Sequence, residues 1–320
     1  MNLLRSHIAA LINQNQTYAR SDLAYQYKKM VVQRFLTGNI FAFLIQYIGL
    51  TMSTLSFIFM PLWISSGTAL ALIFLRGPRI LPGIGLGSIV AYYFANSGIL
   101  HAMECAGLFT FQAYALFRLN YRYASPTLIF YQKKLFFTFF LLSALITAIT
   151  SYLLSIIFYS AFKNHFTQLQ ICLQWWLANL NGLIIFACAI MTWDAHFPQI
   201  DRVKKQIYLL VGSFGAILFC FILLFTVLLV HQTLSISVFI FAFFSFLLTM
   251  SVSIRFGWCG IIAALFLQGL VLPITVFFIP TIVFSHFYPV LYLQVFILFE
   301  IIIGVYGSRF LQFCAGGNSY

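Results

Sequence analysis

The sequence predicts an all-α protein, a polytopic integral membrane helical bundle of about ten transmembrane helices with the N-terminus and the C-terminus in the cytoplasm. Hydrophobic residues make up 62% of the chain and charged residues 7%, whereas a soluble domain carries about 25% charge. Uncharged apolar runs of roughly membrane-spanning length recur along the chain, and the basic residues are grouped between them. These observations exclude a soluble enzyme, an intrinsically disordered binder and a secreted disulfide scaffold.

The apolar runs define the spans in order. Residues 35–75 carry no charge and form a run too long for one helix, since a bilayer core needs about 20 apolar residues. Pro61 interrupts this run and predicts two helices, 37–58 and 61–76, that meet at a tight turn. The third span opens near Pro82, where a missing backbone N–H costs little. The third to tenth spans are predicted at residues 80–98, 99–118, 135–162, 171–193, 207–230, 233–254, 256–284 and 288–308.

The distribution of basic residues supports this division. With the N-terminus inside and each span crossing once, every Lys and Arg except Lys163 falls on the cytoplasmic side. Positive charges resist translocation, so this bias supports both the number of spans and their orientation. The net charge of +12 is therefore assigned to topology. We expect the lipid bilayer, and no nucleic acid, as a partner.

The chain divides into three parts. Residues 1–34 form a cytoplasmic N-terminal tail, either an interfacial helix or a loosely ordered segment. Residues 35–310 form the polytopic membrane region, and residues 311–320 form a short cytoplasmic tail. The loops are short, so any output must pass through helices, cytoplasmic loops or another chain.

Few residues suit catalysis or metal binding. The six cysteines include no CxxC pair and no metal-type spacing, so no metal and no cofactor are predicted. Glu104 and Glu300 are the acidic residues within the predicted spans, which disfavours a membrane-embedded transferase. No phosphate-binding glycine loop and no catalytic motif occurs. We therefore expect no catalytic residues and no enzymatic activity.

Several polar residues fall within the spans. Glu104 follows His101 by three positions, so the two side chains share one face of a helix. They form either a ligand or proton site near the outer face, or a pair that reaches headgroup water. Trp176 is typical of a membrane interface. Asn179 lies one turn deeper and needs a partner from another helix or from a small ligand.

Small residues in the third span predict close helix packing. Gly83 and Gly87 form a small-xxx-small pair in a Pro-Gly-Ile-Gly-Leu-Gly segment. Such pairs let helix backbones approach closely in lipid. We therefore expect the third helix to pack tightly against a neighbour.

Four motifs, in order, resemble the first class of bacterial membrane-associated sensor domains, the MASE family. The segment from Trp63 through Gly67 to Arg76-Gly77 and Pro82-Gly83 resembles the opening Trp-Pro-x-x-Gly region of that family. Trp176-Leu-Ala-Asn179-Leu-Asn-Gly182, Arg255-Phe256-Gly257 and Leu293-Gln294-Val-Phe296 resemble its Trp-x-Gly-Asp-x-x-Gly, Arg-Phe-Gly and Leu-Gln-x-Phe motifs. The resemblance covers residues 36–310.

The resemblance implies an integral sensory domain of the bacterial inner membrane. Ile64 stands where the family has Pro, Gln112 where it often has Glu, and Asn179 where it often has Asp. The missing carboxylates imply either altered ligand chemistry or a site under different demands. The residues expected to bind a ligand are Trp63, Ser66, Gly67, His101, Glu104, Gln112, Trp176 and Asn179, with Gly182 joining Gly83 and Gly87 in helix packing.

Two functions from different classes follow. Family members usually carry a cytoplasmic kinase, cyclase or phosphodiesterase module after the last helix, and this sequence ends there. The first expectation is therefore a stand-alone sensory or regulatory protein that signals through a separate membrane-bound kinase, cyclase-type enzyme or transporter. The alternative is a small-solute transporter or permease, which would use helices broken at Pro61, Pro82, Pro273 and Pro280. Homo-oligomerisation is open in both cases.

Overall fold

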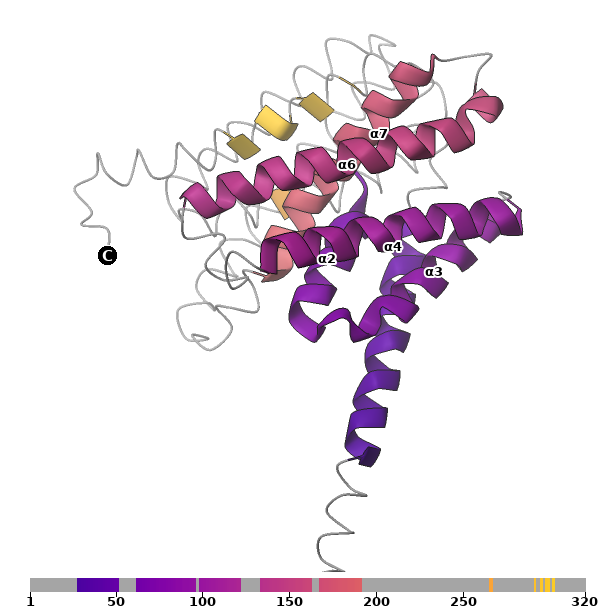
Figure 1. The fold of residues 1–320 in the computed structure, drawn as a ribbon, viewed down its shortest axis with the longest axis vertical. Coiled ribbons are helices and arrows are strands. Elements are labelled where there is room, and N and C mark those ends of the chain that lie inside the picture. Colours follow the sequence, from indigo (N-terminus) through magenta and orange to yellow (C-terminus); the bar gives the residue numbers. More distant parts are fainter. Residues whose placement is uncertain are drawn as a thin grey trace, which may run out of the picture.

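The computed structural model describes residues 28–51, 62–95, 98–121, 133–162 and 167–191, and a few positions between 265 and 302 (Figure 1). Every element within this part is helical, which confirms the predicted all-α class there. The predicted spans 207–230 and 233–254 lie outside the described residues, as do nearly all of spans 256–284 and 288–308. The tail at 311–320 and residues 1–27 lie outside them as well.

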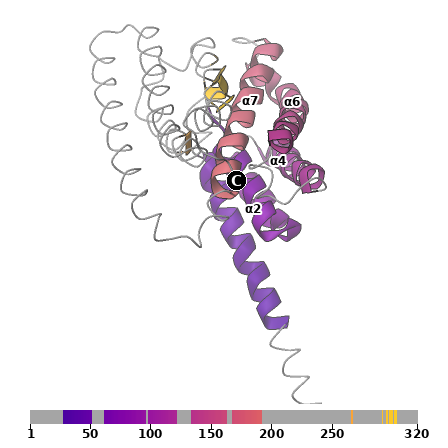
Figure 2. The same cartoon turned by 90° about the vertical axis from the view of Figure 1, so that its left-hand side faces the viewer.

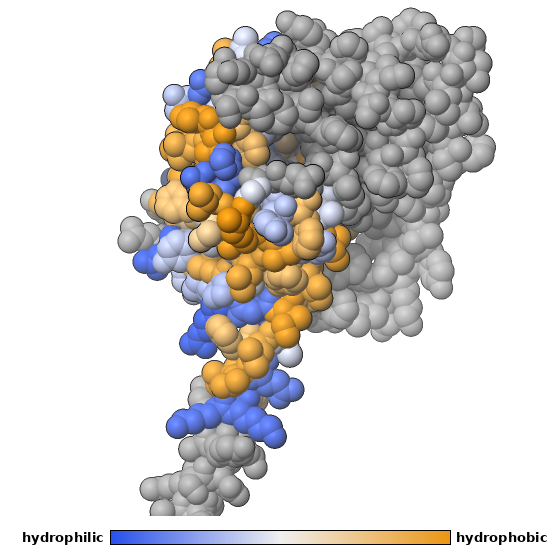
Figure 3. All heavy atoms as spheres, turned by 90° about the vertical axis from the view of Figure 1, so that its right-hand side faces the viewer, coloured by the Kyte–Doolittle hydropathy of each residue, from blue (hydrophilic) through white to orange (hydrophobic). Residues whose placement is uncertain are grey.

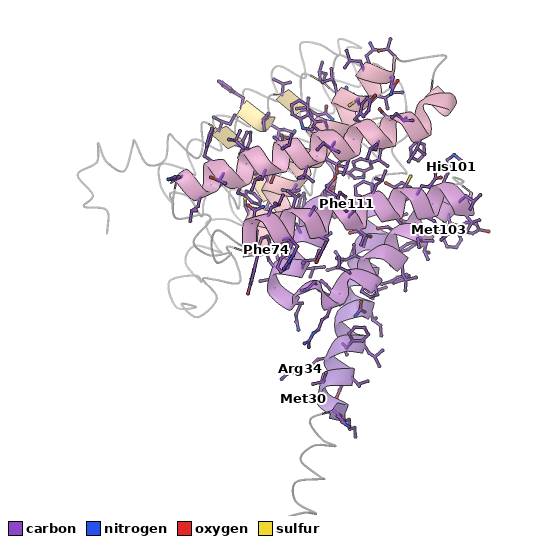
Figure 4. The ribbon with its side chains drawn as sticks, viewed as in Figure 1. Met30, Arg34, Phe74, His101, Met103 and Phe111 are labelled. Atoms are coloured by element: carbon purple, nitrogen blue, oxygen red, sulfur yellow. The ribbon has the colours of Figure 1, made fainter. Side chains whose placement is uncertain are left out.

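The first described element is a helix from Lys28 to Thr51, which projects from the bundle in Figures 1 and 2. It begins before the predicted span 37–58 and includes residues that the sequence assigns to the tail. Its first turns are exposed on nearly all sides, and burial begins at Ala42. The projecting end carries Met30 and Arg34, as Figure 4 shows.

Two short helices follow. Helix α2 spans Ile64–Arg76 and helix α3 spans Leu81–Phe94, with a 3-10 turn, η1, at Pro78–Ile80 between them. Gly77 ends α2 with a φ of 80°, a left-handed backbone conformation that glycine adopts without strain. Proline then occupies the first turn of η1 and of α3, where a missing N–H is tolerated.

Close backbone contact holds α3 against the N-terminal helix. A Cβ placed on Gly83 would lie 2.2 Å from the carbonyl oxygen of Asn39, and one placed on Gly87 would lie 2.6 Å from that of Phe43. The Asn39 side chain bridges the two helices, because its Oδ1 accepts the Gly83 N–H at 2.7 Å. A side chain at either glycine would therefore force the backbone of α3 away from that of the N-terminal helix.

Helices α4 (Ile99–Tyr121) and α6 (Lys133–Phe162) show the reversed polarity of a membrane protein. On α6 the side chains of Leu141 and Leu145 are half exposed, whereas the hydroxyl residues Ser143 and Thr147 are fully buried. A helix in water would bury the leucines and expose the hydroxyls. Lipid accepts the apolar side chains, and the Thr147 hydroxyl donates to the Ser143 carbonyl oxygen of its own helix at 2.6 Å.

Helix α7 begins with a capping box and ends in an irregular turn. It spans Gln168–Gly182, and Thr167 and Gln170 cap each other's backbone N–H groups at its start. A π-helical turn, η2, continues it over Leu183–Ala187, and the helix runs on to Met191. Such turns shift the register of a helix and are frequent at functional sites.

The described helices form one bundle. α3 packs along α4 and α6 along α7, while α2 packs against α4, α7 and η2. Phe139 and Phe186 are among the largest fully buried side chains of its core. Figures 1 and 2 both show α6 and α7 side by side.

Three helices in the described part are long and apolar enough to cross a membrane, Lys28–Thr51, Lys134–Phe158 and Gln168–Met191. α2, with 13 residues, is a shorter apolar helix. Hydrophobic side chains cover much of the described face in Figure 3, and hydrophilic ones gather at the free end of the N-terminal helix. The protein is therefore a membrane protein.

Candidate functional site

The site begins where α2 crosses α7. The backbone N–H of Trp63 donates to the carbonyl oxygen of Ala178 at 2.9 Å, which ties the start of α2 to α7. A Cβ on Gly182 would lie 2.1 Å from the Trp63 carbonyl oxygen, and one on Gly67 would lie 2.3 Å from the Gly182 carbonyl oxygen. The two backbones are thus in direct contact at this crossing.

A buried chain of hydrogen bonds passes through the crossing. The Ser66 hydroxyl of α2 donates to Oδ1 of Asn179 in α7. The Asn179 Nδ2 group donates in turn to the Ser151 hydroxyl of α6 at 3.3 Å. All three side chains are buried, so their interaction is strengthened by the low local dielectric. We call this chain the Ser66–Asn179–Ser151 bridge.

Two further contacts fasten α6 to its neighbours. The Thr150 hydroxyl donates to Oε1 of Gln112 in α4 at 2.5 Å, and both residues are buried. The indole Nε1–H of Trp176 in α7 donates to the Ala144 carbonyl oxygen at 2.9 Å. Neutral amides, hydroxyls and an indole therefore join α2, α4, α6 and α7.

Aromatic rings gather beside the bridge. Trp63 meets Phe109 edge to face with ring centroids 4.9 Å apart, and it lies 5.9 Å from Trp175. Phe109 stacks on Tyr92 at 5.9 Å, and Phe158 meets Trp175 edge to face at 5.2 Å. The five rings come from the start of α2 and from α3, α4, α6 and α7, and we call them the aromatic cluster.

A third polar contact reaches the C-terminal part of the chain. The Nδ2 group of Asn181 donates to the backbone carbonyl of Gln294 at 2.9 Å, and Nε2 of Gln294 donates to the backbone carbonyl of Gln174 at 3.1 Å. Gln294 lies in the predicted tenth span and is fully buried. The α7 helix therefore touches residues far away in the sequence.

The groups at this site are neutral hydrogen-bond donors and acceptors. The buried polar residues that the structure describes are all uncharged amides and hydroxyls. No group of three or more His, Cys, Asp or Glu residues that could hold a metal ion occurs in this part of the chain. The buried amides and hydroxyls can donate hydrogen bonds to a neutral ligand and accept them from it. They can also exchange partners between helices.

The structure brings most of the predicted ligand residues together. Six of the eight surround the α2–α7 crossing and its links to α4 and α6: Trp63, Ser66, Gly67, Gln112, Trp176 and Asn179. His101 and Glu104 share a face of α4, and both are exposed. They lie apart from the buried group because Ala102, Cys105 and Phe109, on the other face of α4, are the buried ones. Figure 4 shows His101 at the N-terminal end of α4.

The predicted packing glycines divide between two contacts. Gly182 lies at the α2–α7 crossing, and Gly83 and Gly87 lie against the N-terminal helix. Gly67, predicted as a ligand residue, has the geometry of a packing residue, since its backbone lies against Gly182 and Phe186.

Several residues of the site were not predicted. The α6 hydroxyls of Thr150 and Ser151, and the rings of Tyr92, Phe109 and Trp175, are absent from the expected set. The sequence does carry a signal for the hydroxyls, because buried Ser and Thr recur at helical spacing on α6. These positions are Ser143, Thr147, Thr150, Ser151 and Ser155.

Comparison with known proteins gives one family. No significant match to the chain was found among curated proteins or among solved structures. The model of the MASE1 family, a family of membrane-associated sensor domains, matches residues 34–306. This range includes every residue of the bridge and of the aromatic cluster, and it covers most of the chain. The protein therefore belongs to the MASE1 family of membrane-associated sensor domains.

Proposed function

We propose that this protein is a multi-pass sensory or regulatory protein of the bacterial inner membrane that acts without catalysis. It recognises a small ligand or a membrane state and passes the signal to a separate protein. In this proposal the chain crosses the membrane about ten times with both ends in the cytoplasm, as the positive-inside rule favours. Its membership of a sensor-domain family supports the sensory role.

The observation that carries the proposal is the Ser66–Asn179–Ser151 bridge at the α2–α7 crossing. A sensor must have two conformations whose relative stability a stimulus can change. A buried neutral bridge between three helices can exchange partners at low cost, since each hydroxyl can turn back to a carbonyl of its own helix. Loosening the bridge would change how α2 packs against α7.

The signal would leave through the cytoplasmic ends of the helices. In the proposed topology, Arg76, Arg118 and Lys134 lie at these ends, and all three are exposed. Such positions can meet a membrane kinase, a cyclase-type enzyme or a transporter, and their charges also favour anionic lipid.

The proposed output can be tested by photocrosslinking in cells. A benzoylphenylalanine at Arg118 should form an adduct with a second membrane protein, because this end of α4 faces the proposed partner. The same group at Leu100, at the opposite end of α4, should not form this adduct. Only self-crosslinks at Arg118, together with solute uptake by proteoliposomes of the purified chain, would favour the permease instead.

The proposed topology predicts the access of thiol reagents. In a variant without its six native cysteines, a cysteine at the exposed position Leu169 should react with a membrane-impermeant maleimide added to cells. A cysteine at Arg118 should react only after the membrane is opened, because it lies at the cytoplasmic end of α4. Labelling of the two positions in the reverse order would contradict the topology.

A further inference from the structure

The aromatic cluster contains two buried hydrogen-bond donors that have no partner in the described part of the chain. The indole Nε1 of Trp63 and the phenol oxygen of Tyr92 are buried and unpaired. The two residues are only 8% and 4% exposed, and both rings contact Phe109. Buried donors are nearly always paired in folded proteins, so two in one cluster require an explanation.

The same fold shows how an indole is normally satisfied. Trp176, which lies next to Trp175 of the cluster, donates its Nε1–H to the Ala144 carbonyl oxygen at 2.9 Å. Trp63 has no such acceptor among the residues that the structure describes, although its own backbone N–H is bonded to the Ala178 carbonyl oxygen. An acceptor supplied from outside the chain would remove this cost.

The chemistry of the cluster selects the ligand. Five aromatic rings offer flat apolar faces, which favour a planar ligand. A ring cage alone would also suit a cation, but an N–H and an O–H present their positive ends to the ligand and oppose one. The buried polar residues that the structure describes carry no charge, which also opposes an ionic ligand.

We propose that the aromatic cluster binds a neutral, planar, membrane-soluble molecule with carbonyl oxygens, of the quinone class. Trp63 Nε1 and the Tyr92 hydroxyl donate to its carbonyl oxygens, and the rings of Phe109, Phe158 and Trp175 pack on its plane. Phe158 and Trp175 are only partly buried, so the ligand enters on their side of the cluster. This inference rests on the proposed sensory function, for which it names the class of ligand.

The proposal predicts how menadione binds the full-length protein in nanodiscs, measured by isothermal titration calorimetry. Menadione should bind saturably and more tightly than 2-methylnaphthalene, which has the same ring system without carbonyls. Trp63→Phe and Tyr92→Phe keep a ring and remove one donor, so each should weaken menadione binding about threefold to tenfold. Tyr93→Phe makes the same change at an exposed neighbour and should leave the affinity unchanged.

The ligand-free variants give a second readout. Tyr92→Phe removes an unpaired buried hydroxyl and keeps the ring, so it should leave the melting temperature of the apoprotein unchanged or raise it. A lower melting temperature or a folding failure in Tyr92→Phe would show that its hydroxyl is already bonded, and would overturn the proposal. Equal binding of the two ring compounds, tighter binding of tetramethylammonium, or equal menadione affinities in all four proteins would overturn it as well.

The test of the quinone site can be distinguished from the test of the sensory function. Menadione binding that depends on both donors but leaves the spacing of α2 and α6 unchanged would keep the site and remove its sensory role. A change in that spacing with another stimulus, without menadione binding, would keep the sensor and remove the quinone site.

Discussion

Replacing Gly182 by alanine is expected to destabilise the purified protein by about 3 kcal/mol. The added methyl group would lie 2.1 Å from the Trp63 carbonyl oxygen and 2.8 Å from its backbone nitrogen. These are backbone atoms, so no side-chain rotation relieves the clash, and α2 must move away from α7. Gly67→Ala should have a similar effect, because its Cβ would meet the Gly182 carbonyl oxygen at 2.3 Å.

Gly107→Ala is the matched control, since it introduces the same methyl group on α4. A Cβ at Gly107 meets nothing within 4 Å, and alanine favours a helix over glycine by about 1 kcal/mol. The three variants can be compared by heating detergent-solubilised protein and measuring the fraction that remains monodisperse. Equal midpoints for Gly182→Ala and Gly107→Ala would show that α2 and α7 are not in backbone contact.

Asn179→Ala should cost about 2 kcal/mol, because it leaves the hydroxyls of Ser66 and Ser151 without their buried interhelical partner. Ser66→Ala removes one of the same bonds, so the double variant should lose less stability than the sum of the two single variants. We expect a coupling energy of about 1 kcal/mol from this double-mutant cycle, measured by reversible unfolding in mixed micelles.

Asn120→Ala is the control for this cycle. Asn120 is also a buried asparagine, but its Nδ2 donates to the Leu116 carbonyl oxygen of its own helix at 2.8 Å. Asn120→Ala should therefore add to Ser66→Ala without coupling. If the effects of Asn179→Ala and Ser66→Ala were also additive, the bridge would contribute no stability between the helices.

Except for the Lys28–Thr51 helix, which begins before its predicted span, the described helices lie where charge and hydropathy place them, because both signals are local. The predicted spans 99–118 and 135–162 correspond to α4 at Ile99–Tyr121 and α6 at Lys133–Phe162. The end of α2 and the start of α3 follow Gly77, Pro78 and Pro82 in the same way. The π-helical turn at Leu183–Ala187 has no such local signal, since its packing against α2 depends on contacts between distant residues.

The site was only partly predictable, for a related reason. Spacing places His101 and Glu104 on one face of a helix, but it does not say whether that face turns toward the bundle. The resemblance to the sensor family pointed to Trp63, Ser66 and Asn179 as site residues. It did not reveal which residues they contact. Ser151 was missed because a serine within a membrane helix can bond to its own backbone, and the sequence does not reveal which serines bond across helices.

The pairing of glycines also depends on the fold. Gly83 and Gly87 are recognisable as a pair because they lie on one helix at small-xxx-small spacing. Gly67 and Gly182 are distant in the sequence and form their contact only when α2 crosses α7. Such a pair becomes visible only in three dimensions.

The central claim is that α2 can pack in two ways, with the Ser66–Asn179–Ser151 bridge formed or broken. It can be tested directly by double electron–electron resonance. Spin labels at the exposed positions Arg76 of α2 and Phe137 of α6 would report the distance between the two helices in lipid. The bridge stabilises one of the two packings, so we predict two distance populations in the wild-type protein. In Asn179→Ala the population without the bridge should grow, and in Asn120→Ala the ratio of the two should stay unchanged. One distance population, identical in all three proteins, would contradict the claim.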